Sequence, residues 1–187
     1  AYVSQQKSRA RSWLFGKALP FWIENGLDLE NGGAFEAVNF SGEPLKDMPK
    51  RLRVQARQTY VFSHAAMLGY QPAEEAIKVP LDFMLRHGRR DDGGFGHILS
   101  PTGHFIDDQA DCYDHAFVLM SLAWAYKATG DKDLLKVATE TMEFLFARLR
   151  HPVNGFKEAG SMNCLRPRDA SSDGGNWSSW MPFDINS

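Results

Sequence analysis

Arg57 is the residue whose type and position most directly suggest chemistry. It lies in a run with helical periodicity, in which Val54, Val61 and Ala65 predict an apolar face. A guanidinium on that face would point into the domain, and a buried charge is costly unless it is paired. Two interpretations stay open. Arg57 is either a structural arginine paired with a carboxylate or carbonyls, or a fixed cation that faces a pocket and stabilises negative charge developing on a ligand oxygen.

Tyr113 is the second candidate, at the start of another helical run. Phe117, Met120 and Trp124 follow it on the same helical face. A tyrosine at the mouth of a pocket can hydrogen-bond a ligand hydroxyl while its ring packs against the apolar side of the ligand. A core tyrosine with a satisfied hydroxyl is the competing interpretation, and the spacing alone does not decide between the two.

A third pattern has the spacing of metal ligands on one helical face. Its members recur at intervals of four, three and four: His104, Asp108, Asp111 and His115. We expect no metal site, because His104 falls in a predicted hairpin and the aspartates are ordinary helix-start residues. His115 is expected to be packed or to support the site, without carrying a proton. The other histidines show no partner pattern and are expected to be structural or exposed: His64, His87, His97 and His151. Arg51 and Arg53 are expected to lie at the surface.

Composition limits the class of partner. The 187 residues are 43% hydrophobic and carry a net charge of -2 without a basic run, which argues against nucleic acid and anionic membranes. A small, neutral or weakly charged partner is expected. No apolar run reaches the length of a membrane span and no signal peptide is evident, so we expect a cytoplasmic protein. Two cysteines, Cys112 and Cys164, are too few for a disulfide framework, and Cys112 is expected to be a buried thiol.

These candidates must be positioned by helices, which the periodicity places in five segments. They are Ser4 to Glu24, Lys50 to Gly69, Ala73 to His87, Asp111 to Thr129, and Lys132 to Arg150. Pro20 and Pro80 are expected to bend the first and third of them. Trp13 in the first helix and Leu68 in the second are expected to face the core.

Loops rich in glycine and ending in an aromatic residue occur three times, each after a helical segment. Their aromatic residues, Phe35, Phe95 and Phe156, lie 60 and 61 positions apart, which indicates an internal repeat. Repeated helix pairs favour an all-α solenoid or closed ring, and the similar hairpin-like loops favour a ring around a pocket. Six pairs would need roughly 360 residues, so we expect about half a ring. Its open apolar faces predict either a truncated gene product or association with a second copy.

Three segments resemble the N-terminal half of the N-acylglucosamine 2-epimerase superfamily. They are RLRVQARQTYVFSHAA (51–66), DDGGFGHILSPTG (91–103) and DCYDHAFVLMSLAWAYKATGD (111–131). The resemblance implies a partial (α/α)6 barrel over residues 1–168. Residues 169–187 are polar and have no helical period, which predicts an irregular tail. It also implies interconversion of sugars at C1 and C2, by histidine-mediated proton transfer through an enediol-like intermediate, without a metal or other cofactor.

The same resemblance implies roles for the two candidates. Arg57 matches the arginine of the family's Q-A-R segment, which favours the catalytic interpretation, and Tyr113 matches a substrate-contacting aromatic position. The family's catalytic histidines lie beyond residue 168, where this sequence has no helical period, so the activity is expected to be absent from this polypeptide on its own. The identity of the sugar, and the choice between epimerisation and isomerisation, stay open.

Two other functions remain as alternatives. Rings of helix pairs also serve glycoside hydrolases, which use two carboxylates across the scissile bond. Candidates for that task are available, although turn and capping chemistry already explains nearly all of them: Asp91, Asp92, Asp107, Asp108 and Asp114. A helix-repeat binding module without catalysis is the other alternative, and an open half-ring would suit it.

Overall fold

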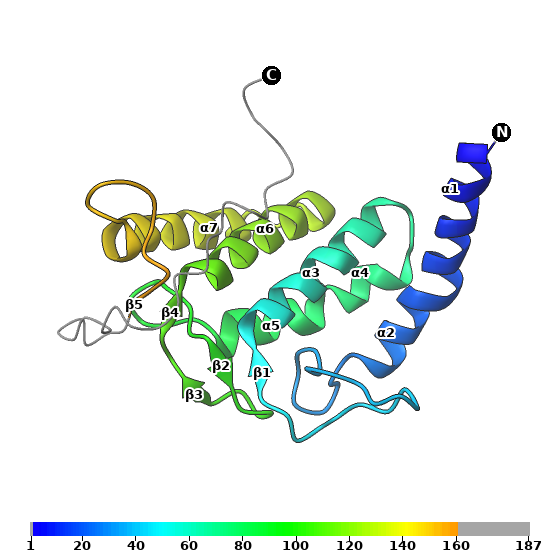
Figure 1. Ribbon diagram of the computed structural model, residues 1–187, viewed down its shortest axis with the longest axis horizontal. Coiled ribbons are helices and arrows are strands. Elements are labelled where there is room, and N and C mark those ends of the chain that lie inside the picture. The colour runs from blue at the N-terminus through cyan, green and yellow to red at the C-terminus, as the bar shows by residue number, and fades with distance from the viewer. Residues whose placement is uncertain (1, 161–187) are drawn as a thin grey trace.

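The computed structural model describes residues 2–160, in which helices are joined by loops and short strands (Figure 1). The helical elements are α1 (Tyr2–Trp13), η1 (Leu14–Ala18), α2 (Leu19–Asn25), α3 (Leu52–Met67), α4 (Pro72–Ala76), α5 (Lys78–His87), α6 (Cys112–Thr129), α7 (Asp133–Phe144) and η2 (Leu145–Leu149). The strands are β1 (Lys50–Arg51), β2 (Ile98–Leu99), β3 (Phe105–Asp107), β4 (Ala110–Asp111) and β5 (Ala159–Gly160). Each expected helical run is present, and none of the described helices is long and apolar enough to cross a membrane. The tail expected over 169–187 lies outside the described residues.

Pro20 and Pro80 each interrupt a helix a few residues before their own position in the sequence. Proline has no backbone N–H and cannot donate to the carbonyl four residues earlier. A π-helical turn, η1, separates α1 from α2 just before Pro20, and the third helical run divides into α4 and α5 at Ile77, three residues before Pro80. The interruptions therefore fall at the carbonyls that each proline leaves without a donor.

The helices α3 and α6 lie side by side, with α5 packed against α3 and α7 against α6 (Figure 1). Both α3 and α6 begin at the end of the molecule where the short strands lie. The third and fifth helical runs each bury an apolar face, which includes Ile77, Leu81, Met84, Leu134, Phe144 and Leu145. The α3–α6 pair therefore carries the central contact, with α5 packed on α3 and α7 packed on α6.

The apolar face predicted for α3 is largely wrong. Of the residues that defined it, only Ala65 is buried, Val54 is half-buried, and Val61 and Leu68 are 39% and 44% exposed. The buried face instead consists of Leu52, Gln55, Ala56, Thr59, Phe62, Ser63 and Ala65. Polar side chains enter the core here because each is hydrogen-bonded: the hydroxyl groups at positions 59 and 63 donate to the helix's own carbonyls four residues earlier, at 2.9 and 2.7 Å.

The expectation for Trp13 is also wrong, since its side chain is 63% exposed and α1 contributes no buried residue. Leu19, the first residue of α2, is buried instead. Cys112 is half-buried, not fully buried as expected, and is a free thiol within residues 2–160. Burial, followed by the negative charge of Asp111, raises the pKa of the Cys112 thiol, so this cysteine is poorly suited to act as a nucleophile.

The repeat seen in the sequence has a structural counterpart in the three glycine loops. An isolated antiparallel bridge closes each loop, and the bridges join Leu27 to Ala34, Arg89 to Phe95, and Arg150 to Phe156. Glycines with positive φ occupy the turns, at positions 32 and 33, 93, and 155. The same local conformation therefore recurs at the spacing that the sequence predicted.

Two small antiparallel sheets extend from these loops. β2 pairs with β1 on one side and with β3 on the other, and the β2–β3 pair is the hairpin expected in the second loop. β4, which leads directly into α6, pairs with β5 from the third loop. The starts of α3 and α6 are therefore each anchored to a strand, which fixes the first residues of both helices.

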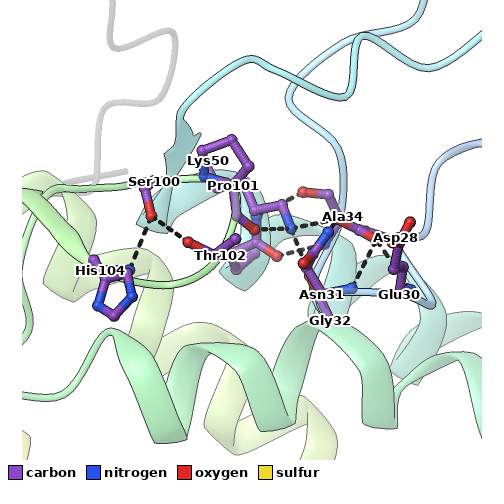
Figure 2. A network of polar contacts seen from close by, with 11 residues as sticks. Asp28, Glu30, Asn31, Gly32, Ala34, Lys50, Ser100, Pro101, Thr102 and His104 are labelled. Atoms are coloured by element: carbon purple, nitrogen blue, oxygen red, sulfur yellow. Dashed lines mark hydrogen bonds and ion pairs between the residues drawn. The ribbon is translucent and has the colours of Figure 1, made fainter.

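A buried lysine joins the first loop to the second (Figure 2). Lys50 is fully buried, and its Nζ lies 2.8 Å from Asp28 Oδ2 and donates to the carbonyls of Gly32 and Pro101 at 2.6 and 2.8 Å. Its ammonium group also lies 4.7 Å from the centre of the Phe83 ring. All three N–H donors are therefore used, which is the condition under which a buried ammonium group is tolerated. We interpret Lys50 as a structural residue that fixes the loops at the start of α3.

Candidate functional site

The candidate site is the surface where α3 and α6 run beside each other away from the core, which we call the α3–α6 face. Each helix contributes four side chains at intervals of four, three and four: Arg53, Arg57, Tyr60 and His64 from α3, and Tyr113, Phe117, Met120 and Trp124 from α6. These side chains are exposed or half-buried. Aromatic contacts join the two rows, with ring centres 5.3 Å apart for Tyr60 and Trp124 and 4.4 Å apart for His64 and Trp124. The face is therefore both aromatic and basic.

Arg57 and Tyr113 meet on this face. Arg57 Nη2 donates a hydrogen bond to the Tyr113 hydroxyl at 2.7 Å, and the guanidinium carbon lies 4.3 Å from the centre of the Phe117 ring. The expectation that Arg57 is enclosed by the domain is wrong for the described residues, since its side chain is exposed. The reason is the misassigned face of α3, because Arg57 lies opposite the buried side of that helix. Tyr113 is 45% exposed and is therefore not a core tyrosine in this part of the chain.

Arg53 is more than the surface residue expected from the sequence. Its side chain is half-buried, with 24% of its surface exposed, and Nη1 lies 3.4 Å from Asp114 Oδ1. Its guanidinium carbon lies 5.8 Å from the centre of the Tyr113 ring, the same distance as that of Arg57. One tyrosine ring is thus flanked by two guanidinium groups, four residues apart on α3.

Sequence reasoning missed the pair formed by His97 and Asp114. His97 Nδ1 lies 2.6 Å from Asp114 Oδ2, and the Asp114 side chain is fully buried. Burial raises the pKa of the Asp114 carboxyl above 3.8, although the hydrogen bond from His97 acts in the opposite direction. The sequence offered little signal for this contact, because the partners come from the hairpin and from the first turn of α6, where an aspartate is common.

His115 is packed, as expected, and it stabilises the second glycine loop. Its Nδ1 lies 2.6 Å from the carbonyl of Asp111, and its Nε2 accepts a hydrogen bond from the backbone N–H of Phe95 at 3.0 Å. Those contacts require a neutral ring with the proton on Nδ1. Burial lowers the pKa of His115 below 6.5, in agreement with a neutral ring.

Gln55 occupies the corresponding position in α3. It is the fourth residue of α3, as His115 is of α6, and it binds the first glycine loop. Gln55 Oε1 accepts from the backbone N–H of Ala34 at 2.6 Å, and Nε2 donates to the carbonyl of Ala34 at 2.9 Å. α3 and α6 therefore use the same position for the same purpose, with different side chains.

The residues with metal-like spacing do not converge. His104 and Asp108 are exposed, Asp111 Oδ1 accepts the backbone N–H of Asp114 at the start of α6, and both ring nitrogens of His115 have partners. Within residues 2–160 there is no group of three histidine, cysteine, aspartate or glutamate side chains that could hold a metal ion.

Most of the aspartates considered for hydrolysis have local structural roles. Asp92 forms an ion pair with Arg90 and accepts the backbone N–H of Gly94, and Asp107 accepts the backbone N–H of Gln109. Asp114 is fully buried and is held by His97. The contacts of Asp92 and Asp107 agree with the turn roles expected from the sequence, whereas Asp114 pairs with residues distant in the sequence. The α3–α6 face has no exposed pair of carboxylates among the described residues.

Comparison with known proteins relates these features to one family. The sequence model of the family described as "N-acylglucosamine 2-epimerase (GlcNAc 2-epimerase)" matches residues 33–172. A mannose-6-phosphate isomerase from Rhizobium meliloti is 31% identical over 159 residues, which are 83% of this chain and 41% of that protein. A cellobiose 2-epimerase from Dictyoglomus turgidum is 31% identical over 156 residues, 81% of this chain and 39% of that protein.

A solved structure is similar over the same region. The cellobiose 2-epimerase from Spirochaeta thermophila superposes with a TM-score of 0.80 at 29% identity, covering 86% of this chain and 40% of that one. The chain thus spans about 40% of the length of the relatives it matches.

Proposed function

Because this chain belongs to the N-acylglucosamine 2-epimerase family, we propose that it forms part of an (α/α)6 barrel that epimerises or isomerises a sugar at C1 and C2. In that barrel α3 and α6 are inner helices, and the α3–α6 face lines the sugar-binding cavity. The proposal rests on the family relationship together with the exposed row of basic and aromatic side chains on that face.

The observation that carries the chemical part of the proposal is the contact between Arg57 and Tyr113. When a proton leaves the carbon next to a carbonyl group, negative charge develops on the carbonyl oxygen. The Arg57 guanidinium is a cation whose other N–H donors have no acceptor among residues 2–160, and it stabilises such an enediolate oxygen. We assign Arg57 this catalytic role.

Tyr113 binds the sugar in this proposal. Its hydroxyl oxygen accepts the hydrogen bond from Arg57, so its own proton is available to a sugar hydroxyl. The Tyr113 ring packs at 71° against Phe117, with ring centres 4.9 Å apart, which holds it at the surface of the face. Packing of a pyranose against exposed aromatic rings is a common way to bind sugars through their C–H groups.

The proton-transferring groups are not assigned within residues 2–160. The family resemblance places the catalytic histidines beyond residue 168, and we propose that this part of the chain supplies charge stabilisation and sugar binding. The proposed enzyme needs no metal or organic cofactor, because a base, an acid and a charge-stabilising cation suffice for an enediol mechanism.

The test is isotope exchange with the full-length protein. Aldoses and ketoses are incubated with it in deuterated water, and NMR follows deuterium at C2 together with the appearance of the epimer or ketose. We expect exchange that depends on the protein. Release of reducing ends from oligosaccharides without exchange would indicate a glycoside hydrolase, and sugar binding without either reaction would indicate a binding module; both results would contradict the proposal.

A further inference from the structure

Two guanidinium groups lie next to each other on the α3–α6 face. Arg53 and Arg57 are one helical turn apart on α3, a spacing that places their Cβ atoms about 6 Å apart. Both guanidinium carbons lie 5.8 Å from the centre of the same Tyr113 ring. The proposed catalytic chemistry uses Arg57 and leaves Arg53 without a role.

Most N–H donors of this pair have no acceptor among the described residues. A guanidinium group has five N–H donors in a planar fork. Arg57 uses one of them for the Tyr113 hydroxyl, and Arg53 has a single contact with Asp114. That contact measures 3.4 Å, which is longer than the 2.7–2.9 Å common for charge-assisted hydrogen bonds. The unused donors belong to side chains that reach the open face.

The positive charge of the pair is only partly balanced. No carboxylate within residues 2–160 forms an ion pair with Arg57. Asp114 is the carboxylate nearest to Arg53, but it is fully buried and its other oxygen lies at the shorter distance of 2.6 Å from His97. Asp114 is therefore shared between Arg53 and His97, and Arg57 has no carboxylate partner among the described residues. The face favours an anionic ligand group.

We propose that the sugar substrate carries a phosphate group and that Arg53 binds this group beside Arg57. A planar guanidinium fork matches phosphate oxygens in bidentate geometry. Because the two arginines lie one helical turn apart, Arg53 can hold the phosphate while Arg57 contacts the sugar oxygens. This inference rests on the proposed function. It differs from the expectation drawn from the net charge, because the ligand is now anionic and not neutral or weakly charged.

The test is calorimetric binding with the full chain and four ligands: fructose 6-phosphate, fructose, glucuronate and inorganic phosphate. We expect fructose 6-phosphate to bind at least about tenfold more tightly than fructose, as a charge-assisted hydrogen bond contributes. Equal binding of the two sugars would overturn the inference. So would glucuronate or inorganic phosphate binding as tightly as the sugar phosphate, since the first favours a carboxylate site and the second a site without sugar recognition.

Substitutions assign the effect to Arg53. Arg53→Gln should weaken fructose 6-phosphate binding about tenfold and fructose binding less than twofold. Arg86→Gln on α5 is the matched control, because it removes the same charge from an exposed position and should change neither affinity. An equal loss for both sugars in Arg53→Gln would contradict the assignment.

A second variant distinguishes a direct loss of phosphate binding from a folding defect. Arg53→Lys keeps the charge next to Asp114 and loses the planar fork, so it should fold normally and bind the sugar phosphate less tightly than wild type. Wild-type affinity in this variant would contradict bidentate binding. Isotope exchange on free sugars with no preference for sugar phosphates would refute this inference and leave the proposed function intact. Sugar phosphate binding without exchange on any sugar would refute the proposed function alone.

Discussion

The guanidinium of Arg57 and the hydroxyl of Tyr113 share a 2.7 Å hydrogen bond between helices, although the two residues lie 56 positions apart in the sequence. Sequence patterns nominated them separately, each against a structural alternative. Their contact on an exposed face favours a common role, because neither side chain is needed to fill the core there. A bound sugar that contacts one of them is therefore within reach of the other.

Replacing Arg57 with alanine should lower turnover with little effect on stability. Loss of a charge-stabilising donor commonly reduces kcat by about a hundredfold or more. Arg57 is exposed, and its described hydrogen bond is the one to Tyr113, so thermal unfolding should change by only a few degrees. Isotope exchange and Tm are measured on the same preparation of full-length protein, with Arg86→Ala as control. Normal turnover in Arg57→Ala would remove the catalytic assignment.

Replacing Tyr113 with phenylalanine should weaken sugar binding while leaving the fold intact. The variant keeps the ring contact with Phe117 and loses only the hydroxyl. Loss of one neutral hydrogen bond corresponds to about 1 kcal/mol, or roughly fivefold in affinity. Tyr70→Phe is a suitable control, since Tyr70 packs against Phe15 away from this face. Unchanged KM and unchanged turnover in Tyr113→Phe would place the hydroxyl outside the site.

Replacing Gln55 with leucine should destabilise the fold. Gln55 accepts from the N–H of Ala34 and donates to its carbonyl in a fully buried environment, and leucine would leave both backbone groups unsatisfied. Each such group costs about 1–3 kcal/mol, so urea unfolding should show a loss of at least about 2 kcal/mol. Gln58→Leu, on the same helix but only half-buried, is the control. Equal stability of the two variants would show that the first loop is held by other contacts.

Stability should fall in acid because of His115. Its pKa is lower in the folded protein than the ordinary 6.5, so the unfolded chain binds the proton more readily. The stabilisation from His115 is therefore fully present above pH 6.5 and is lost as the pH falls through 6.5 toward the folded pKa. Asp114 acts with the opposite sign, since its raised pKa gives stabilisation below pH 3.8 that is lost as the pH rises through its folded pKa.

The variant His115→Gln separates these effects. Glutamine at the corresponding position of α3 already accepts a loop N–H, so His115→Gln should keep that hydrogen bond and remove the titration. Urea unfolding at pH 5 and pH 7.5 should show a larger difference for wild type than for the variant. An identical pH dependence would mean that His115 does not titrate on unfolding in this range.

Periodicity predicted the helical runs and the repeat, because helix length and glycine turns are local properties of the sequence. It predicted the wrong buried face for α3. Gln55, Thr59 and Ser63 are buried there, and Val61 is exposed. Counting apolar residues fails there because the buried polar groups are satisfied by hydrogen bonds to backbone atoms. The apolar residues on the other side of α3 face the open surface.

The candidate site was predictable from the sequence only in part. Arg57 and Tyr113 could be nominated from their own helices, and the family resemblance predicts that both contact the sugar. The contact between His97 and Asp114 and the half-buried position of Arg53 depend on how the hairpin meets α6, which no local pattern encodes. Long-range pairs of this kind are set by packing and so need the three-dimensional structure.

A crystal structure of the protein with a bound aldose, or with its open-chain alditol, would show where the sugar binds. We expect a sugar oxygen within hydrogen-bonding distance of the Arg57 guanidinium and of the Tyr113 hydroxyl on the α3–α6 face. A sugar bound elsewhere, with Arg57 and Tyr113 still paired only to each other, would contradict the proposed roles of both residues.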